Sequence, residues 1–457
     1  MSAVHLRSLR SLRGVRGSPA SRPRPVDLRN LRNLRNLRMA KLLVLFVTAF
    51  VDMVGLAMIV PLLPYYATTF GANAAVVGLL ISAFSVAQLA VAPVWGKFSD
   101  RYGRRPAILA GLMVTGVAYL IFGFAGTVWV LLLSRIIQGI GGGTIGVVQA
   151  YVADASPPER RTKSLGWLTA VTSLGAVVGP AFGSFMISLG GQHAPGVGAA
   201  ILSGLVAVFA WKYLRESREL RASGTHLVPS GTTSMSAIKR VLTHWHEPAA
   251  RLIWIYTIGI GAFYGTIQIV PLLLQQRLGV TEENIGYFIM YLGGMGVLVR
   301  SIILGRMVDW LGEVRLARLG LVVLSAGLAA TGVAHGGLVL LLGFTLMPIG
   351  TAFVFPCVTG LLSRVIPSTE RGLYMGVQQT FGGVSRVIFP IAAGVMMDQL
   401  GMGVPFWVSA VLLLGTLPLI NAIAREVTQP VPTPVPVEEQ IASAEVTAEI
   451  PLKPEAG

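Results

Sequence analysis

Two ionisable residues deep inside long apolar stretches have the side chains needed to bind and release a proton. Asp52 lies about eleven residues, or roughly 16 Å, beyond Lys41, where its apolar stretch begins. Arg135 lies at a depth that differs by only about 5 Å, a gap that an arginine side chain can bridge. We therefore expect both to face one cavity, where Arg135 would favour ionised Asp52 and protonation would loosen their contact. The alternative is a static buried pair that only fixes packing.

Other polar side chains at similar depth indicate what else this cavity could hold. Arg300 and Arg386 lie in later apolar stretches, so three deep arginines stand against one clear acid, Asp52. Because buried cations are costly in lipid, this excess favours a guest with negative charge or many hydrogen-bond acceptors. The side chains that we place around a substrate cavity are Gln88, Gln138, Gln268, Arg300, Gln378 and Arg386. Five of the six histidines lie outside the apolar stretches and the sixth, His335, is the last residue of one, so we expect no metal site and no cofactor.

The apolar stretches themselves are long enough to be membrane-spanning helices. The 457-residue chain is 53% hydrophobic and only 12% charged, which is far too apolar for a water-soluble protein. Its twelve apolar stretches each match a bilayer core about 30 Å thick. They are 41–66, 76–96, 106–126, 128–152, 164–188, 196–213, 251–275, 285–306, 316–335, 337–362, 372–397 and 403–424. The sequence thus predicts an all-α, polytopic membrane protein with twelve transmembrane helices.

Landmarks in the first half of the chain recur in the second half at nearly constant spacing. Asp100 and its flanking glycines recur around Asp309, which lies 209 residues later. Pro61 recurs as Pro271 after 210 residues. Parallel six-helix repeats, related by an axis along the membrane normal, are typical of alternating-access carriers. We therefore expect two pseudo-symmetric six-helix bundles.

The charges of the connecting segments predict the orientation of the chain. Loops after even-numbered stretches are rich in Lys and Arg, whereas loops after odd-numbered stretches carry only Arg277. The positive-inside rule then places both termini in the cytoplasm, in a multi-pass protein of the cell membrane. The expected segments are a basic disordered N-terminal segment (1–38), the first bundle (39–214), a cytoplasmic linker (215–250), the second bundle (251–425) and a Pro/Glu-rich disordered tail (426–457). In the linker, residues 235–245 could form a short amphipathic helix.

The N-terminal segment contributes ten arginines to the net charge of +16. Its Leu-Arg-Asn triplets repeat from Leu28 with a period of three, which gives no stable apolar stripe on a helix. Three interpretations stay open: an organellar transit peptide, a basic tail that holds the N-terminus in the cytoplasm, or translated upstream sequence ahead of a start at Met39. We favour the last two. Most other cations lie in loops, so the charge does not indicate nucleic-acid binding.

A short, charge-dense loop follows the second apolar stretch. Residues 96–106 read GKFSDRYGRRP, in which Asp100 is the lone acid and could interact with the positive end of a neighbouring helix. The simple alternative is a solvated loop whose cations only fix the topology. The loop resembles the signature of the major facilitator superfamily, with Phe98 in place of the usual leucine. The gating residues that this resemblance implies are Gly96, Asp100, Arg101, Gly103 and Arg104, with Asp309 as the counterpart in the second half.

The resemblance also implies where these acids bind. In the superfamily, contacts of such acids with helix N-termini close the cytoplasmic side. We therefore expect Asp100 to approach Gly372, at the start of span eleven. By symmetry, Asp309 should approach Ser164, at the start of span five.

Span five carries a second motif. Gly175, Gly179 and Gly183 recur every fourth residue and form a smooth stripe, while Pro180 removes one backbone hydrogen bond. The stretch resembles the antiporter motif of drug:proton exporters, with Ser184 in place of a final glycine. The segment that begins at Arg135 resembles another motif, whose arginine is associated with proton coupling.

Taken together, these motifs resemble the tetracycline-efflux branch of the twelve-span drug:proton antiporters, most densely over residues 46–184. An acid that this branch carries in span three falls on Ala118 here. The resemblance implies a proton-coupled exporter of a small organic molecule, working by alternating access as a monomer in the lipid bilayer. A uniporter or importer is the alternative within transport. A lipid-acting membrane enzyme, or a nucleic-acid or anionic-lipid binder that uses the basic N-terminus, would be alternatives of other classes.

Overall fold

The computed structural model describes residues 28–156, 160–214, 216, 234–367 and 370–428 as helices and short connections. The helices of the first half are α1 (Leu28–Ile59), α2 (Leu63–Thr69), α3 (Ala74–Tyr102), α4 (Arg104–Gly123), α5 (Val128–Gly142), α6 (Ile145–Ala155), α7 (Arg161–Gly190) and α8 (His193–Tyr213). Those of the second half are α9 (Ser234–Thr243), α10 (Pro248–Ile267), α11 (Val270–Leu278), α12 (Glu282–Leu298), α13 (Leu304–Val333), α14 (Gly337–Val365), α15 (Arg371–Leu400), α16 (Val404–Leu414) and α17 (Leu417–Thr428), with a π-helical turn at Val299–Ile303 between α12 and α13.

The described residues contain eleven continuous segments that are long and apolar enough to cross a membrane. One of them, Glu282–Val333, has 52 residues and would extend for about 78 Å, more than twice the thickness of a bilayer core. It is broken at Gly312, where a φ of 74° is incompatible with a continuing helix. This segment therefore provides two spans, and the expected all-helical protein with twelve spans is confirmed.

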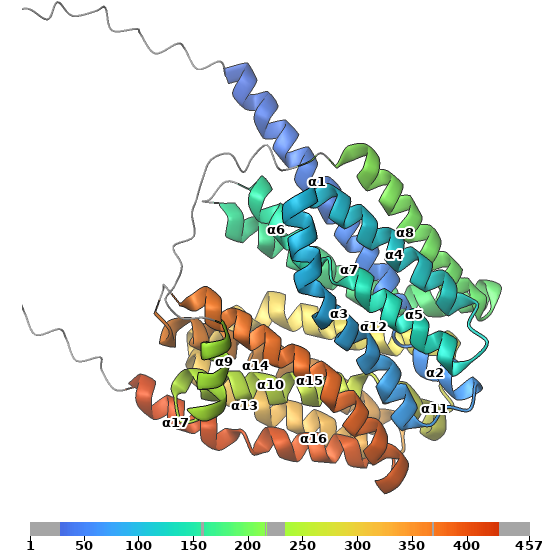
Figure 1. Ribbon diagram of the computed structural model, residues 1–457. Helices are drawn as coiled ribbons and strands as arrows, with labels where there is room; N and C mark the ends of the chain where they lie inside the picture. Colours follow the sequence, from blue (N-terminus) through green and yellow to red (C-terminus); the bar gives the residue numbers. More distant parts are fainter. Residues whose placement is uncertain (1–27, 157–159, 215, 217–233, 368–369, 429–457) are drawn as a thin grey trace, which may run out of the picture.

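The helices pack as two groups, one from each half of the chain (Figure 1). Within the first group α1 packs on α7 and α8, and α4 packs on α5 and α8; within the second, α13 packs on α14, and α10 packs on α15. The main helix pairs that join the groups are α3 with α15 and α7 with α12. These pairs correspond to each other under the sequence repeat, because each joins an early helix of one half to a late helix of the other.

Two glycines allow the joining helices to come very close. A Cβ atom on Gly78 of α3 would overlap the carbonyl oxygen of Pro390 on α15. A Cβ atom on Gly286 of α12 would likewise overlap the carbonyl oxygen of Pro180 on α7. Since Pro180 and Pro390 lie 210 residues apart, the repeat relates these two contacts as well.

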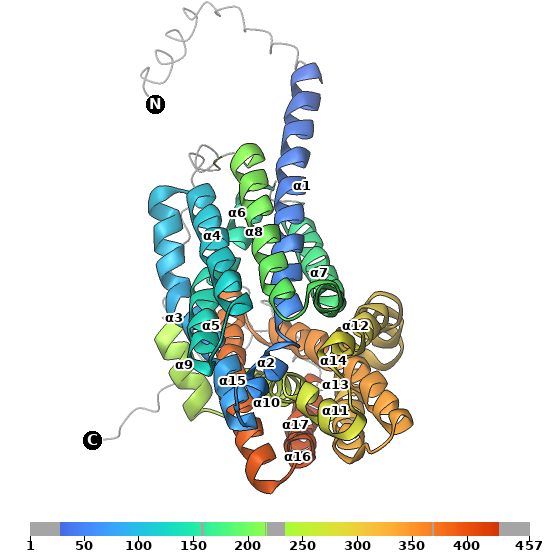
Figure 2. The ribbon, with the colours of Figure 1, turned by 90° about the vertical axis from the view of Figure 1, so that its right-hand side faces the viewer.

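The first helix differs from the expectation for the N-terminal segment. Residues 28–38 are helical, as the first turns of α1, which projects beyond the other helices (Figure 2). Leucine and arginine favour helix, and adding turns to an existing helix needs no new nucleus. The expected disorder of residues 1–27 and of the tail from residue 429 lies outside the described residues.

The short linker helix that we expected is present as α9, which packs against α10 and α15. Its buried residues Ala237 and Val241 are four positions apart, so they lie on one face. After α9, the Glu247 carboxylate accepts hydrogen bonds from Nε of Arg240 at 2.9 and 3.0 Å. The hydrogen bond and charge of Glu247 raise the pKa of the Arg240 guanidinium.

Candidate functional site

A cluster of polar side chains lies deep in the first half of the molecule. Arg135 on α5 is only 2% exposed, and its guanidinium donates a hydrogen bond to Oε1 of Gln138 one turn further along the helix. The same guanidinium lies 4.9 Å from the centre of the Phe84 ring on α3. From α4, the hydroxyl of Tyr119 interacts electrostatically with both Arg135 and Asp52. We call Asp52, Tyr119, Arg135 and Gln138 the deep polar cluster.

The direct contact that depth suggested between Asp52 and Arg135 is not made in the part of the chain that the structure describes. The Gln138 side chain, on the same helix, accepts a hydrogen bond from the Arg135 guanidinium. Arg135 therefore has a hydrogen-bond partner without extending toward Asp52 on α1. The Tyr119 hydroxyl interacts electrostatically with both residues. A Cβ atom on Gly55, one turn from Asp52, would lie 3.2 Å from the Tyr119 ring, so α1 and α4 meet closely here.

Three polar atoms of the deep polar cluster lack a partner. Among the described residues, the Tyr119 hydroxyl, Nε of Arg135 and Nε2 of Gln138 are buried and form no hydrogen bond. A buried polar group without a partner costs about 1–3 kcal/mol, so such atoms are usually satisfied by water or by a ligand. The Asp52 carboxylate can accept a proton, and its charge acts on the Tyr119 hydroxyl.

Sequence reasoning missed Tyr119. In span three, the acid of the tetracycline-efflux branch aligns with Ala118, which is buried and has no polar group. A polar residue one position further along could have been found by asking which side chain replaces the missing acid.

Among the described residues, no hydrogen bond joins the residues expected around a substrate cavity to one another. Gln88 donates to the carbonyl of Gly142 at 3.1 Å, and Gln268 donates to that of Tyr264 at 3.2 Å. Gln378 is fully buried and lies 3.4 Å from the Thr359 hydroxyl. Arg300 is exposed on the π-helical turn, whereas Arg386 lies over the Tyr264 ring at 5.7 Å.

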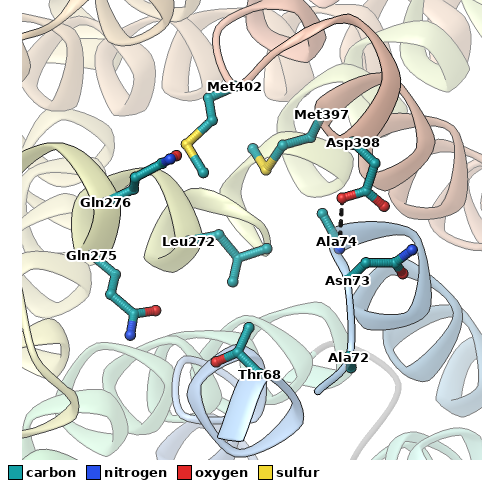
Figure 3. Close-up of a pocket in the computed structure, with 10 residues that line it drawn as sticks. All are labelled: Thr68, Ala72, Asn73, Ala74, Leu272, Gln275, Gln276, Met397, Asp398 and Met402. Atoms are coloured by element: carbon teal, nitrogen blue, oxygen red, sulfur yellow. Dashed lines mark hydrogen bonds between the residues drawn. The ribbon is translucent and has the colours of Figure 1, made fainter. Parts of the chain in front are cut away.

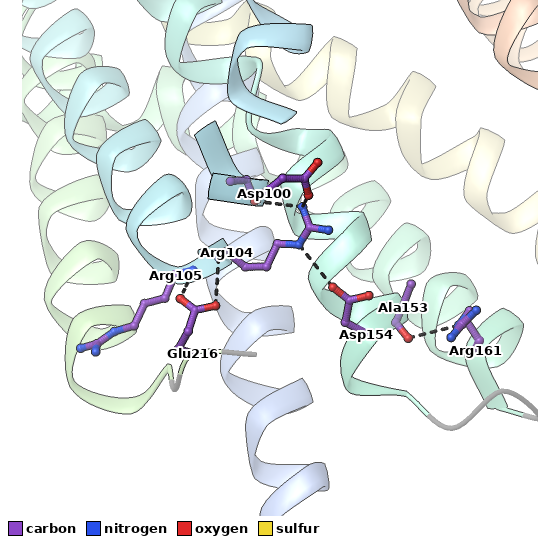
Figure 4. A network of polar contacts seen from close by, with 8 residues as sticks. Asp100, Arg104, Arg105, Ala153, Asp154, Arg161 and Glu216 are labelled. Carbon is purple, nitrogen blue, oxygen red and sulfur yellow. Dashed lines mark hydrogen bonds and ion pairs between the residues drawn. The ribbon is translucent and has the colours of Figure 1, made fainter. Parts of the chain in front are cut away.

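The predicted gating loop is held by a network of charges (Figure 4). Arg104 forms ion pairs with Asp100 at 3.1 Å and with Asp154 of α6 at 3.3 Å. The carboxylate of Glu216, just after α8, accepts hydrogen bonds from the backbone N–H groups of Arg104 and Arg105 at 3.0 and 3.1 Å. Glu216 thereby caps the start of α4.

The turn before α4 depends on a glycine. Gly103 has a φ of 107°, a conformation that side chains disfavour, and a Cβ atom there would overlap the Glu216 carboxylate. Glu216 and Asp154 were not among the expected site residues, because each lies at the end of a helix rather than within the loop motif.

The expected contacts of Asp100 and Asp309 with distant helix N-termini are not seen in this structure. Open space surrounds the position of a Cβ atom on Gly372 and on Gly96, with no atom within 4 Å. Asp309 has no hydrogen bond or ion pair among the described residues; the ion pair near it joins Glu313 to Arg364 at 2.8 Å. Arg101 lies on the outer side, 5.4 Å from the Tyr102 ring centre.

The two halves meet instead at the end of the molecule away from these loops. We call the end that carries residues 97–105 the basic end, and the other the opposite end. At the opposite end the Asp398 carboxylate of α15 accepts hydrogen bonds from the backbone N–H groups of Ala74 and Ala75, at 2.9 and 2.8 Å (Figure 3). These residues begin α3, so the acid of one half caps a helix of the other. A pocket of ≈ 370 Å³ lies beside this contact.

The second joining pair makes a corresponding contact at the opposite end. The Ser184 hydroxyl of α7 donates to the carbonyl of Glu282 at 2.6 Å and accepts from the N–H of Gly286 at 3.0 Å. Nearby, the Tyr65 hydroxyl donates to the carbonyl of Val280 at 2.9 Å. The structure is therefore closed at the opposite end, while the helices diverge at the basic end (Figure 1).

A sequence model of the Major Facilitator Superfamily matches residues 45–385 and 301–454. The chain belongs to this superfamily.

Relatives within the superfamily match most of the chain. Multidrug resistance protein 1 of Bacillus subtilis (strain 168) is 27% identical over 373 residues, covering 80% of this chain and 91% of that protein. The class B tetracycline resistance protein of Escherichia coli is 26% identical over 373 residues, covering 81% and 90%. The human organic anion transporter MFSD10 (TETRAN) has the same fold, with a TM-score of 0.61 at 23% identity over 84% of this chain and 99% of that one. The chain is thus a membrane transporter rather than an enzyme.

The glycine stripe of this superfamily member lies against α1. Cβ atoms on Gly175 and Gly179 would lie 2.7 and 2.8 Å from the carbonyl of Phe50 and the Cβ of Ala57. Gly183 meets the carbonyl of Met58 in the same way. With Pro180 against Gly286, the stretch Gly175–Ser184 therefore contacts α1 with its glycines and the other half with its proline and serine.

Proposed function

We propose that this superfamily member is a proton-coupled exporter of small organic molecules that works by alternating access in the cell membrane, with both termini in the cytoplasm. The deep polar cluster is the observation that carries the proposal. Its carboxylate, Asp52, lies at mid-depth and shares a neighbour, Tyr119, with the cation of Arg135. A proton that binds Asp52 removes one charge from a group of buried atoms without partners, which changes their preferred arrangement.

The contacts between the halves at the opposite end support alternating access, because the Asp398 and Ser184 contacts close that end in this state. In a second state, Asp100 and Asp309 at the basic end would form analogous contacts with Gly372 and Ser164. The names of the relatives, which are multidrug and tetracycline resistance proteins, favour a drug-like substrate. Because Ala118 stands where the tetracycline branch has an acid, we do not assign tetracycline.

The proposal is tested with purified protein in liposomes under an imposed pH gradient. Wild-type protein should accumulate an organic substrate against its concentration gradient when protons flow the other way, and an ionophore that collapses the pH gradient should abolish accumulation. Asp52→Asn should lower pH-driven accumulation at least about tenfold, because the proton site is lost. Glu283→Gln, which removes an exposed acid at the start of α12, is the matched control.

A uniporter or importer is the second candidate. Downhill flux that ignores the pH gradient in both wild type and Asp52→Asn would favour a uniporter. Accumulation in the same direction as the protons would favour an importer.

A further inference from the structure

Arg386 is a cation at the middle of a membrane-spanning helix. It lies 15 residues after Arg371, which begins α15, and 12 residues before Asp398, near its end. At 1.5 Å per residue these separations correspond to about 22 Å and 18 Å. The side chain is half-buried, so it is neither sealed in the core nor fully in contact with the surroundings.

The charge of Arg386 is not neutralised by the protein. No carboxylate forms an ion pair with it among the described residues, and its Nε atom is shielded from solvent without a hydrogen-bond partner. The charge pairs of Arg104 and Arg364, by contrast, lie at the basic end. A guanidinium at mid-membrane without an anion is costly, and it presents a planar fork that matches a carboxylate or a sulfonate.

The residues around Arg386 are aromatic and polar rather than acidic. Its guanidinium lies 5.7 Å from the centre of the Tyr264 ring and interacts electrostatically with the Tyr256 hydroxyl. Gln379 lies 3.4 Å from the same hydroxyl. A Cβ atom on Gly382, one turn before Arg386, would lie 2.9 Å from the Tyr256 ring, so α10 and α15 place the two phenol side chains beside the cation.

Aromatic side chains continue along the same two helices. Trp254 of α10 and Phe381 of α15 meet edge to face, with ring centres 5.6 Å apart. Phe389 packs against Gly261 and Gly265 on the other side of Arg386. The surroundings thus combine one unpaired cation, hydroxyl groups that can donate, and ring faces on which an aromatic body can stack.

We propose that Arg386 binds the acidic group of the transported molecule, and that the substrate class is aromatic organic anions. This inference rests on the proposed function, because it names the cargo of the same carrier. Tyr264 holds the guanidinium plane from one side, and the Tyr256 hydroxyl supplies a further donor to the acid group. The substrate anion supplies the negative charge that neutralises Arg386, which no carboxylate among the described residues does.

The test uses two probes that share one ring and differ in charge, naphthalene sulfonate and naphthylmethyl-trimethylammonium. Neither crosses a lipid bilayer readily. Wild-type protein in liposomes should transport the sulfonate under a pH gradient. Arg386→Gln should lower sulfonate transport at least about tenfold, as expected for loss of a charge-assisted hydrogen bond, while Arg386→Lys should retain part of it. Arg318→Gln, which removes an exposed arginine near the basic end, should transport the sulfonate like wild type.

Binding is measured alongside flux, as the rise in Tm that each probe causes in purified protein. The sulfonate should raise the Tm of wild type but not of Arg386→Gln. Transport of the ammonium probe alone, or equal sulfonate transport by wild type and Arg386→Gln, would overturn the inference while leaving proton-coupled export intact. Sulfonate binding that depends on Arg386, with flux that ignores the pH gradient, would support the anion site and contradict the proposed coupling. If Arg386→Gln unfolds, Arg386→Lys decides: a sulfonate affinity below that of wild type, in a variant with a wild-type Tm, supports the site, and an unchanged sulfonate affinity contradicts it.

Discussion

Asp52 and Arg135 form no ion pair in the described structure, yet both interact with one buried hydroxyl, that of Tyr119. A hydroxyl can donate a hydrogen bond to a carboxylate and can rotate away from a neutral acid. The orientation of the Tyr119 hydroxyl, and with it its interaction with Arg135 and Gln138, can therefore depend on the protonation of Asp52. The hydroxyl, Nε of Arg135 and Nε2 of Gln138 all lack hydrogen-bond partners among the described residues. Small rotations of these side chains can therefore form new hydrogen bonds without breaking existing ones at these atoms. At the scale of single residues, we therefore propose that the deep polar cluster acts as a switch rather than as a fixed pair.

Tyr119→Phe tests this role without disturbing the packing of the ring. We expect the stability of the protein to be nearly unchanged, because the hydroxyl has no hydrogen bond in the described structure to lose. Accumulation driven by a pH gradient should nevertheless fall several-fold, as measured by flux into liposomes. A variant that transports like wild type across the whole pH range would show that the hydroxyl takes no part in coupling.

At the scale of helices, the two joining pairs act as closures of the opposite end. Asp398 caps α3 of the other half, and Pro180 and Ser184 of α7 lie against the start of α12. Both closures join a helix start to a helix of the other half through backbone groups. Such contacts depend on the exact approach of two helices, so they break together when the helices separate.

Asp398→Asn should weaken the first closure. The amide keeps only one acceptor oxygen and loses the charge that favours the helix N-terminus, at a cost of about 1 kcal/mol, which corresponds to about a fivefold shift toward the state that is open at the opposite end. A cysteine at Ser82, which is buried between α3 and α15, reports this opening through its rate of labelling by a membrane-impermeant thiol reagent.

We expect the labelling rate in the Ser82→Cys background to rise several-fold with Asp398→Asn and to stay constant with Glu283→Gln. Native Cys357 is buried, and Cys357→Ser removes it from the measurement. An unchanged labelling rate in Asp398→Asn would mean that the cap contributes nothing to closure.

Gly286→Ala should open the second closure. Its new Cβ atom would overlap the carbonyl of Pro180, so α7 and α12 must move apart, at a cost of about 1–3 kcal/mol. Gly294→Ala lies on the same helix, where the nearest atom is 3.9 Å away, and is the matched control. We expect faster labelling at Ser82→Cys and slower transport for Gly286→Ala only. Equal behaviour of the two variants would contradict a special role for the Gly286–Pro180 contact.

At the scale of the whole molecule, the halves meet at the opposite end and diverge at the basic end (Figure 1). The space around Gly96, Gly166, Gly305 and Gly372 is open, and these glycines lie on helices that carry or face the gating residues. In alternating access, closing the basic end requires opening the opposite end. We propose that Asp100 then stabilises the second state.

Spin labels at Gly96 and Gly372 measure this exchange as a distance distribution. A pH gradient or substrate that favours the second state should add a shorter distance between the labels. Asp100→Asn should reduce the share of that shorter distance, because the amide interacts more weakly with the helix N-terminus of α15. Because the second state is open at the opposite end, Asp100→Asn should also slow the labelling of Ser82→Cys. An unaltered distance distribution in Asp100→Asn would exclude the proposed latch.

The sequence by itself determined the twelve spans, the internal repeat and the membership of a transporter superfamily, because apolar length and motif spacing are local properties. Residues 28–38 were the exception: their helix follows from their attachment to the first span rather than from any apolar stripe. The depth of Asp52 and Arg135 in the membrane located the deep polar cluster. It did not predict which side chains they contact, because the depth of a residue does not determine the direction of its side chain.

Only the tertiary structure decided which end is closed and which residues close it. Asp398 and Ala74 are 324 positions apart in the sequence. The roles of Asp398, Gly78 and Gly286 can be recognised only once the helices that they join are placed side by side. The same holds for Glu216, whose capping of α4 requires the end of α8 to return to the gating loop. Contacts between distant helices depend on packing, which no local pattern of residues encodes.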